Sequence, residues 1–263
     1  MSRTNSANGH EGGILSEYNP FSLSGKAILI TGASSGIGQA TAVSCSRLGA
    51  KVVVCARDSG RLEETLNLLS GSGHSKIVAE LSNLDGLKDV VDEMPAVDGL
   101  VLCAGRGLTL PFLFGVKVKY DEIFNINFHS PVELLRLAVK KKKLNPNSSV
   151  VFVSSIGGNK VFSVGNAIYG ASKAAINSTM KFCAKELALK KIRVNSVNPG
   201  MTMTKLINRG TLTEEQFKAD MERYPLKRYG EPDDIANGIV YLLSNASSWV
   251  TGHALVIDGG VSI

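Results

Sequence analysis

Short apolar runs recur along the chain at intervals that leave room for a helix between them. Amphipathic stretches with helical spacing fill several of these intervals, as in Ile37–Leu48, Arg61–Leu69 and Ala171–Leu189. Alternating strands and helices pack as a parallel sheet covered on both faces, so the pattern predicts one doubly wound α/β domain. The candidate strands are Ala27–Ile30, Val52–Cys55, Lys76–Ala79, Gly99–Leu102, Val150–Val153, Arg193–Val197 and Ala254–Ile257.

Two segments depart from this alternation. Residues 1–20 are rich in Ser, Asn and Gly and hold no long apolar run. We therefore expect a flexible N-terminal tail rather than a secretion signal, followed by a catalytic domain over residues 21–263. Residues 201–232 are irregular, and Thr213 with Gln216 predicts a capping box that starts a short helix. We interpret this second segment as a lid over the substrate.

The composition is typical of a globular protein, with 44% hydrophobic residues, 20% charged residues and a net charge of +6. The apolar runs are far shorter than the roughly 20 residues that a membrane-spanning helix needs. The positive charge is not gathered into an aromatic-flanked groove of the kind that binds nucleic acid. We therefore expect a cytoplasmic protein with no membrane or nucleic-acid partner.

The cysteines and histidines give no sign of a disulfide framework or a metal site. The four cysteines are widely spaced and form no C-x-x-C pair, so we expect reduced thiols. None of the four histidines stands at metal-ligand spacing from another histidine or a cysteine, so we expect no bound metal.

A glycine-rich turn follows the first candidate strand. The run Thr31–Gly38 has the sequence Thr-Gly-Ala-Ser-Ser-Gly-Ile-Gly and leads into a helical pattern. Gly32 would permit the tight turn, Gly36 would let a pyrophosphate approach the backbone, and Gly38 would let helix and strand pack closely. The helix N-terminus would offer free N–H groups to the phosphates, as in a Rossmann-type domain. The expected phosphate-binding residues are Gly32, Ser34, Ser35, Gly36, Ile37 and Gly38.

The end of the second candidate strand bears on the choice of dinucleotide. Arg57 stands where an NAD-binding protein would present a carboxylate to the ribose 2′-hydroxyl. Its guanidinium can pair bidentately with a 2′-phosphate, and Ser34 can add a hydroxyl. The sequence therefore favours NADP(H). Asp58 leaves NAD(H) open, because a shift of one residue would bring its carboxylate to the ribose.

Tyr169 and Lys173 are four residues apart at the start of a helical pattern, so both project from one face. Lowering a tyrosine pKa from about 10 to about 7 takes roughly 4 kcal/mol. An ammonium about 4 Å away supplies roughly that energy at an effective dielectric near 20. We therefore expect Tyr169 to protonate a carbonyl oxygen as hydride arrives. The alternative is a core tyrosine beside an unrelated surface lysine.

From Leu23 to the C-terminus the chain resembles the short-chain dehydrogenase/reductases, in particular those of the 3-oxoacyl-[acyl-carrier-protein] reductase type. The resemblance implies that Ser155 holds the substrate oxygen, with Ser154 as its nearest competitor. It also implies that Lys173 binds the nicotinamide ribose and that Asn127 supports a water relay for the proton. Its markers are Thr31–Gly38, Cys103-Ala104-Gly105, Asn127, Ser154-Ser155, Tyr169 with Lys173, Asn198-Pro199-Gly200 and Asp258-Gly259-Gly260.

The resemblance extends to the rest of the cofactor cleft. Two positions depart from it: Leu102-Cys103 replaces a pair of asparagines, and Glu80 replaces the usual Asp beside the adenine. The longer Glu80 side chain is still expected to reach the adenine amine. The cofactor-binding residues implied beyond the glycine turn are Arg57, Glu80, Leu81, Cys103, Ala104, Gly105, Tyr169, Lys173, Pro199, Gly200, Thr202 and Thr204.

The function implied is NADPH-dependent reduction of a 3-oxoacyl chain on an acidic carrier in fatty acid biosynthesis, by a homo-oligomer that is commonly a tetramer. The carrier would dock on Lys140–Lys143 with Lys190, Lys191 and Arg193, although a solvated helix end also explains the first run. One alternative is the same chemistry on a sugar, polyol, steroid or other small ketone. A catalytically silent nucleotide-sensing or scaffold protein is another, and the complete catalytic set argues against it.

Overall fold

The computed structural model describes residues 18–204 and 213–263. Within these ranges the chain forms one parallel sheet in the order β3-β2-β1-β4-β5-β6-β7, which confirms the predicted fold. All seven candidate strands are present; β7 has the predicted bounds, and the other six differ at one or both ends. Their bounds are β1 Ala27–Thr31, β2 Lys51–Ala56, β3 Ser75–Val78, β4 Val97–Leu102, β5 Leu144–Val153, β6 Arg193–Pro199 and β7 Ala254–Ile257.

Helices connect consecutive strands, as parallel pairing requires. The described α-helices are α1 Gly36–Arg47, α2 Ser59–Asn67, α3 Leu87–Glu93, α4 Lys117–Phe124, α5 Ser130–Lys140, α6 Ala167–Leu187, α7 Glu214–Met221 and α8 Pro232–Leu243. A π-helical turn at Asn125–His129 joins α4 to α5. Helix α7 starts with the predicted capping box of Thr213 and Gln216.

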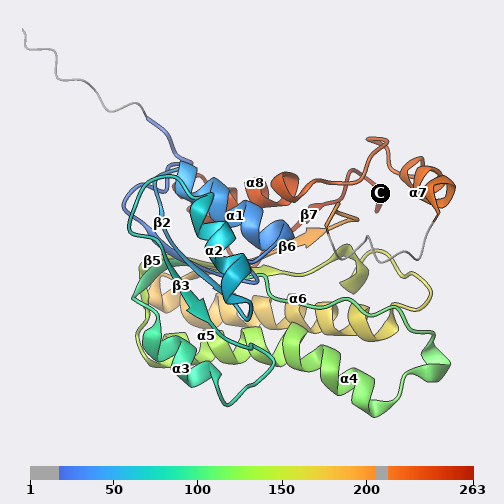
Figure 1. Ribbon diagram of the computed structural model, residues 1–263, viewed down its shortest axis with the longest axis horizontal. Coiled ribbons are helices and arrows are strands. Elements are labelled where there is room, and N and C mark those ends of the chain that lie inside the picture. The colour runs from blue at the N-terminus through green and yellow to red at the C-terminus, as the bar shows by residue number, and fades with distance from the viewer. Residues whose placement is uncertain (1–17, 205–212) are drawn as a thin grey trace, which may run out of the picture.

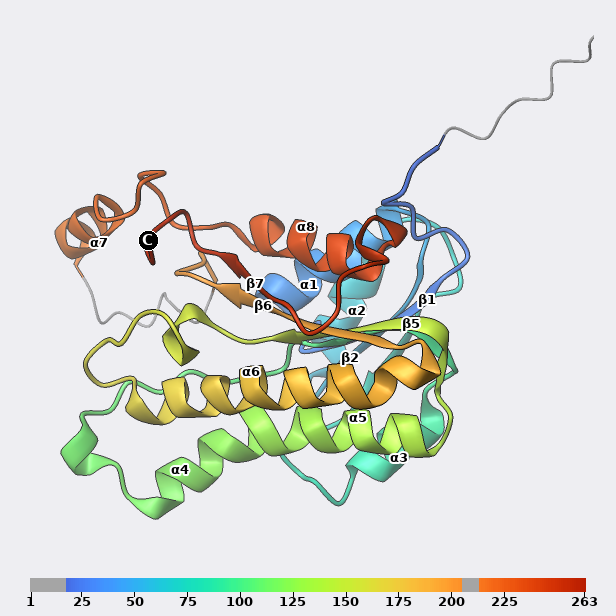
Figure 2. The same cartoon turned by 180° about the vertical axis from the view of Figure 1, so that it is seen from behind.

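The helices form two layers around the sheet. Helices α1, α2 and α8 lie on one side and α3 to α6 on the other, as Figure 1 and the reverse view in Figure 2 show. Side chains alternate along each strand, so Ile28 and Ile30 of β1 join the core under α1 and α8, while Leu29 joins the core under α5 and α6. The central strands are therefore apolar on both faces.

Strand β1 pairs with β2 on one side and with β4 on the other. The order of the strands reverses at this point, and ligands of such sheets bind where the carboxyl ends of the strands flank the crevice. The glycine turn, Arg57 and Ser155 all follow the carboxyl ends of strands, on the side of the sheet where this crevice lies. No helix in the described ranges is long and apolar enough to span a membrane.

Candidate active site

The glycine turn after β1 has the backbone conformation that the sequence predicted. Gly32 and Gly36 have φ values of +68° and +54°, in the left-handed region that favours glycine. A Cβ on Gly38 would lie 2.3 Å from the carbonyl oxygen of Gly32, which is too close for any side chain. A Cβ on Gly32 would lie 2.9 Å from the backbone of Ala104, so the turn packs against the end of β4.

Helix α1 begins at this turn with an open N-terminus. Ser35 takes the capping position in an extended conformation, but its side chain makes no capping hydrogen bond, and the first turn has no acidic residue. Backbone N–H groups at a helix start have no partner within the helix, and the helix dipole favours an anion there. The turn therefore fits a pyrophosphate. Thr204 lies over the same turn, since its Cγ2 would be 3.2 Å from a Cβ on Gly36.

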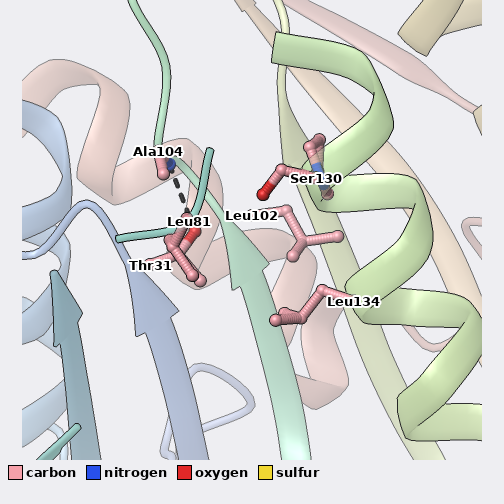
Figure 3. Close-up of a pocket in the computed structure, with 7 residues that line it drawn as sticks. Thr31, Leu81, Leu102, Ala104, Ser130 and Leu134 are labelled. Atoms are coloured by element: carbon pink, nitrogen blue, oxygen red, sulfur yellow. Dashed lines mark hydrogen bonds between the residues drawn. The ribbon is translucent and has the colours of Figure 1, made fainter. Parts of the chain in front are cut away.

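Beside the turn is a small hollow at the ends of β1 and β4 (Figure 3). Its rim joins Leu81 and Ala104, two residues expected at the adenosine end of the cofactor. Thr31 supports this rim: its Oγ1 accepts hydrogen bonds from the N–H groups of Cys103 at 3.0 Å and Ala104 at 3.1 Å. The Thr31 hydroxyl thus supports the turn that lacks the two asparagine side chains. Sequence reasoning assigned Thr31 to the motif but missed this role.

The two acidic residues near Arg57, Asp58 and Glu80, both have partners within the protein. Asp58 caps α2, because its Oδ1 accepts from the N–H of Arg61 at 3.0 Å. Glu80 Oε2 lies 3.2 Å from Nη1 of Arg57, and its Oε1 accepts from the N–H and hydroxyl of Ser82. The Ser82 hydrogen bonds, aided by Arg57, lower the pKa of Glu80. Both Glu80 oxygens thus have protein partners, and the expected contact with the adenine amine stays a prediction.

Tyr169 and Lys173 lie together in the first turns of α6. The Lys173 ammonium is 5.8 Å from the centre of the Tyr169 ring, and it donates to the carbonyl of Val153 at the end of β5 at 2.8 Å. Ser155 follows β5, and its hydroxyl lies beside the Tyr169 ring, since a Cβ on Gly157 would be 3.4 Å from Ser155 Oγ and 3.9 Å from Tyr169 Cε1. The hydroxyl of Ser154 instead donates to the backbone carbonyl of Lys173 at 2.9 Å. Ser155, not Ser154, therefore faces the phenol.

The pKa values of this pair differ from the sequence argument. Burial raises the pKa of Tyr169, and the neighbouring Ser155 hydroxyl acts in the opposite direction. Burial also lowers the pKa of Lys173 to about 8, since an ammonium loses its water shell there. The expected lowering of the phenol pKa by Lys173 is thus wrong for this structure, because loss of water around the phenolate is the largest effect on that pKa. A protonated phenol is nevertheless the form that can act as a general acid.

Asn127 is buried in the π-helical turn between α4 and α5. Its side chain accepts from the N–H of Arg106 at 2.8 Å and donates to the hydroxyl of Ser172 at 3.1 Å. A Cβ on Gly105 would lie 3.1 Å from Asn127 Oδ1 and 3.3 Å from Lys173 Nζ. Asn127 therefore stands beside the ammonium. Turns of this kind occur often at functional sites, but the residue pattern gave no sign of one.

The remaining expected cofactor residues follow β6. Pro199 ends the strand, and Gly200 packs against the backbone of Asp258, where a Cβ would be 2.9 Å away. Thr202 is buried and donates its hydroxyl to the carbonyl of Gly200 at 3.2 Å. Thr204 reaches back to the glycine turn, as described above. Residues 205–212 of the expected lid lie outside the described ranges.

The basic residues expected to dock a carrier lie where the strands begin, because the run Lys140–Lys143 precedes β5. Tyr169 lies at the other end of the strands, after β5. Lys141 pairs with Asp92. The guanidinium of Arg193 donates to three backbone carbonyls, so it holds β6 to neighbouring segments. Arg193 is thus structural, and within one chain the expected docking face does not border the site. The described residues also contain no cluster of His, Cys, Asp and Glu that could hold a metal ion.

Comparison with known proteins gives consistent similarities. A family model described as Enoyl-(Acyl carrier protein) reductase matches residues 32–262. A 3-oxoacyl-[acyl-carrier-protein] reductase of Rickettsia felis is 32% identical over 242 residues, which is 91% of this chain and 98% of that protein. A tropinone reductase homolog of Arabidopsis thaliana is 32% identical over 250 residues, which is 92% of each.

A solved structure has the same architecture. It is a candidate 2-deoxy-d-gluconate 3-dehydrogenase of Agrobacterium tumefaciens with bound NADP, and it superposes with a TM-score of 0.85 at 31% identity. The match covers 93% of this chain and 99% of that one. The relatives thus share a fold and a type of chemistry, while their named substrates differ.

Proposed function

Because the chain belongs to the short-chain dehydrogenase/reductase family of oxidoreductases, we propose that it is an NADPH-dependent reductase of 3-oxoacyl chains held as thioesters on an acyl carrier. The observation that carries the chemistry is that the Ser155 hydroxyl and the Lys173 ammonium lie close to the Tyr169 ring, while the raised pKa of the phenol keeps its proton in place near neutral pH. The open N-terminus of α1 and Arg57 support a phosphorylated dinucleotide beside it. NADP in the related solved structure agrees with this cofactor.

The side chains divide the work of a reduction. The hydroxyls of Ser155 and Tyr169 bind the carbonyl oxygen, and Tyr169 gives that oxygen its proton. Reduced nicotinamide, when bound, supplies the hydride. Lys173 binds the ribose hydroxyls, and with a pKa of about 8 its ammonium can lose a proton near neutral pH. The π-helical turn at Asn127 adjoins that ammonium and supports a water relay that returns the proton.

Apolar loops favour an acyl chain over a sugar. The connections after β4 and β5 are joined by a 2.8 Å hydrogen bond from Leu110 N–H to the carbonyl of Gly165, four residues before Tyr169. These two loops expose large apolar side chains at Phe112, Leu113, Phe114, Phe162 and Val164. Exposed apolar surface of this kind usually marks a site for a ligand or a partner. An acyl chain would bury these apolar side chains, whereas a polar sugar would not.

A substrate panel tests the proposal. Initial rates of NADPH oxidation are compared on acetoacetyl carrier protein, acetoacetyl and crotonyl thioesters of coenzyme A, tropinone and a keto sugar acid. We expect the acetoacetyl substrates to give the highest kcat/KM. Faster turnover of the keto sugar acid or tropinone would favour the alternative that the relatives suggest. Faster turnover of the crotonyl thioester would indicate an enoyl reductase, as the family description names.

The silent alternative is tested by Tyr169→Phe. This variant should lose turnover while it keeps its affinity for NADPH, because the phenol acts on the substrate rather than on the phosphates. Unchanged turnover would overturn the proposed mechanism. Loss of NADPH binding together with turnover would instead indicate that the phenol holds the dinucleotide site.

We also propose that the enzyme works in the cytoplasm, in fatty acid biosynthesis, as a homo-oligomer. Large apolar side chains are exposed at two places, Phe182 on α6 and Trp249 before β7. Two separate contact faces fit a tetramer. Light scattering on the purified chain tests this, and a mass of one subunit would contradict it.

A further inference from the structure

Arg57 and Glu80 are brought together by the pairing of β2 with β3. Ala56 of β2 stands opposite Val78 of β3 in the parallel register, and the N–H of Ala79 donates to the carbonyl of Ala56 at 3.0 Å. Figure 1 shows the two strands side by side at the edge of the sheet. The residues that follow the carboxyl ends of the two strands therefore lie close together, beside the expected ribose site.

Glu80 is the more firmly held partner of the pair. Its Oε1 accepts from the N–H of Ser82 at 3.1 Å and from the Ser82 hydroxyl at 2.8 Å. Its Oε2 faces Nη1 of Arg57 at 3.2 Å. The Arg57 side chain is 78% exposed and the Glu80 side chain 46%. Arg57 can thus move while the carboxylate keeps its place.

We propose that the Glu80 carboxylate pairs with Arg57 in the free protein and thereby reduces the ratio of the affinity for NADP(H) to the affinity for NAD(H). A dinucleotide with a free 2′-hydroxyl leaves the pair intact, so Arg57 stays neutralised. A 2′-phosphate must draw the guanidinium away from Glu80 and lie near a like charge. The affinities of the cleft for the two dinucleotides therefore differ by less than they would if Arg57 had no acidic partner. This inference rests on the dinucleotide site of the proposed function.

The size of the effect follows from the exposure of the pair. Exposed ion pairs contribute at most about 1 kcal/mol, which is about fivefold in an equilibrium constant. We therefore expect Glu80→Gln to bind 2′,5′-ADP about three- to fivefold more tightly than the parent enzyme. Binding of 5′-AMP, which lacks the 2′-phosphate, should stay the same.

Calorimetric titration of the full chain with 2′,5′-ADP and with 5′-AMP tests this without turnover. Ser82→Ala, which releases the carboxylate from its anchor, should shift 2′,5′-ADP binding in the same direction by a smaller factor. Glu122→Gln removes one charge from another ion pair, with Lys119 on α4, and is the matched control. It should change neither affinity.

A double-mutant cycle with Arg57→Ala distinguishes an effect of Glu80 through its ion pair with Arg57 from direct repulsion between Glu80 and the 2′-phosphate. If Glu80 acts through Arg57, Glu80→Gln should have little effect in the Arg57→Ala background. A full effect there would overturn the inference, as would unchanged or weaker binding of 2′,5′-ADP by Glu80→Gln. Weaker binding of both nucleotides would assign Glu80 to the adenine instead.

The outcome is separable from that of the proposed function. If the parent enzyme binds both nucleotides but reduces no acyl thioester, the substrate proposal fails while the two affinities still test Glu80. If it binds neither nucleotide, the dinucleotide site is wrong and the inference falls with it.

Discussion

Ser154 and Ser155 are adjacent hydroxyls at the end of β5, yet they have different neighbours. Ser155 faces the Tyr169 phenol, whereas Ser154 donates to the backbone of α6. Ser155→Ala should lower kcat by about 10²- to 10³-fold, the usual cost of removing a donor to a developing oxyanion. Ser154→Ala should cost far less. Steady-state rates of the two variants check this, and equal losses would contradict the assignment.

Lys173 links the site to stability because its pKa of about 8 lies below the ordinary value of 10.5. The unfolded chain then binds more protons than the folded one between pH 8 and 10.5, so folding becomes more favourable as pH rises through that window. Below pH 8 the cost of the buried ammonium is fully present.

Comparison with Lys173→Met isolates this effect. Between pH 7 and 10, the free energy of unfolding of the parent chain should rise by about 2 kcal/mol relative to that of the variant. Urea unfolding at several pH values measures both chains. A difference that stays constant over this range would contradict the lowered pKa.

Helix α2 begins directly after Asp58. Asp58 caps this helix, and this use of its carboxylate argues against the ribose contact that the sequence left open. Asp58→Ala should lower the free energy of unfolding by about 1 kcal/mol, the usual value of an N-cap. It should leave the ratio of KM for NADPH to KM for NADH unchanged. A changed ratio would restore Asp58 as a ribose ligand.

Elements with strong periodicity were predictable, and those shaped by tertiary contacts were not. The strands β1, β2 and β4 were found because each has a run of buried apolar residues that covers both faces of the sheet. Strand β5 begins at Leu144, whereas the sequence predicted it only from Val150. The first half was missed because it contains Pro146 and Asn147, and Asn147 has a φ of +65°. Pairing with β4 extends it through a bulge that no local pattern indicates.

The candidate site divides in the same way. The glycine turn and the Tyr169–Lys173 spacing follow from local geometry, so the sequence predicted them. The direction of the Tyr169 pKa depends on how deeply the ring is buried, which only the assembled fold decides. The Glu80–Arg57 pair likewise depends on the register of β2 and β3, residues far apart in the sequence.

At the scale of the whole molecule, the two cores share one sheet. The core under α1 and α8 and the core under α5 and α6 are built from alternate residues of the same strands, such as Ile28 and Leu29. Neither core can lose its packing while the other keeps its strands in place. We therefore expect residues 21–263 to unfold in one cooperative transition.

Ligand binding should move that transition as a unit. NADPH at 100 times its Kd stabilises the folded state by about 2.7 kcal/mol, which for a chain of this size raises Tm by roughly 5–10 °C. Differential scanning calorimetry with and without NADPH measures this shift. Because the glycine turn follows β1, which pairs with a strand on each side, stabilisation there should reach every strand through the hydrogen bonds between neighbouring strands. Two transitions, of which NADPH moves only one, would mean that part of the chain folds independently of the cleft.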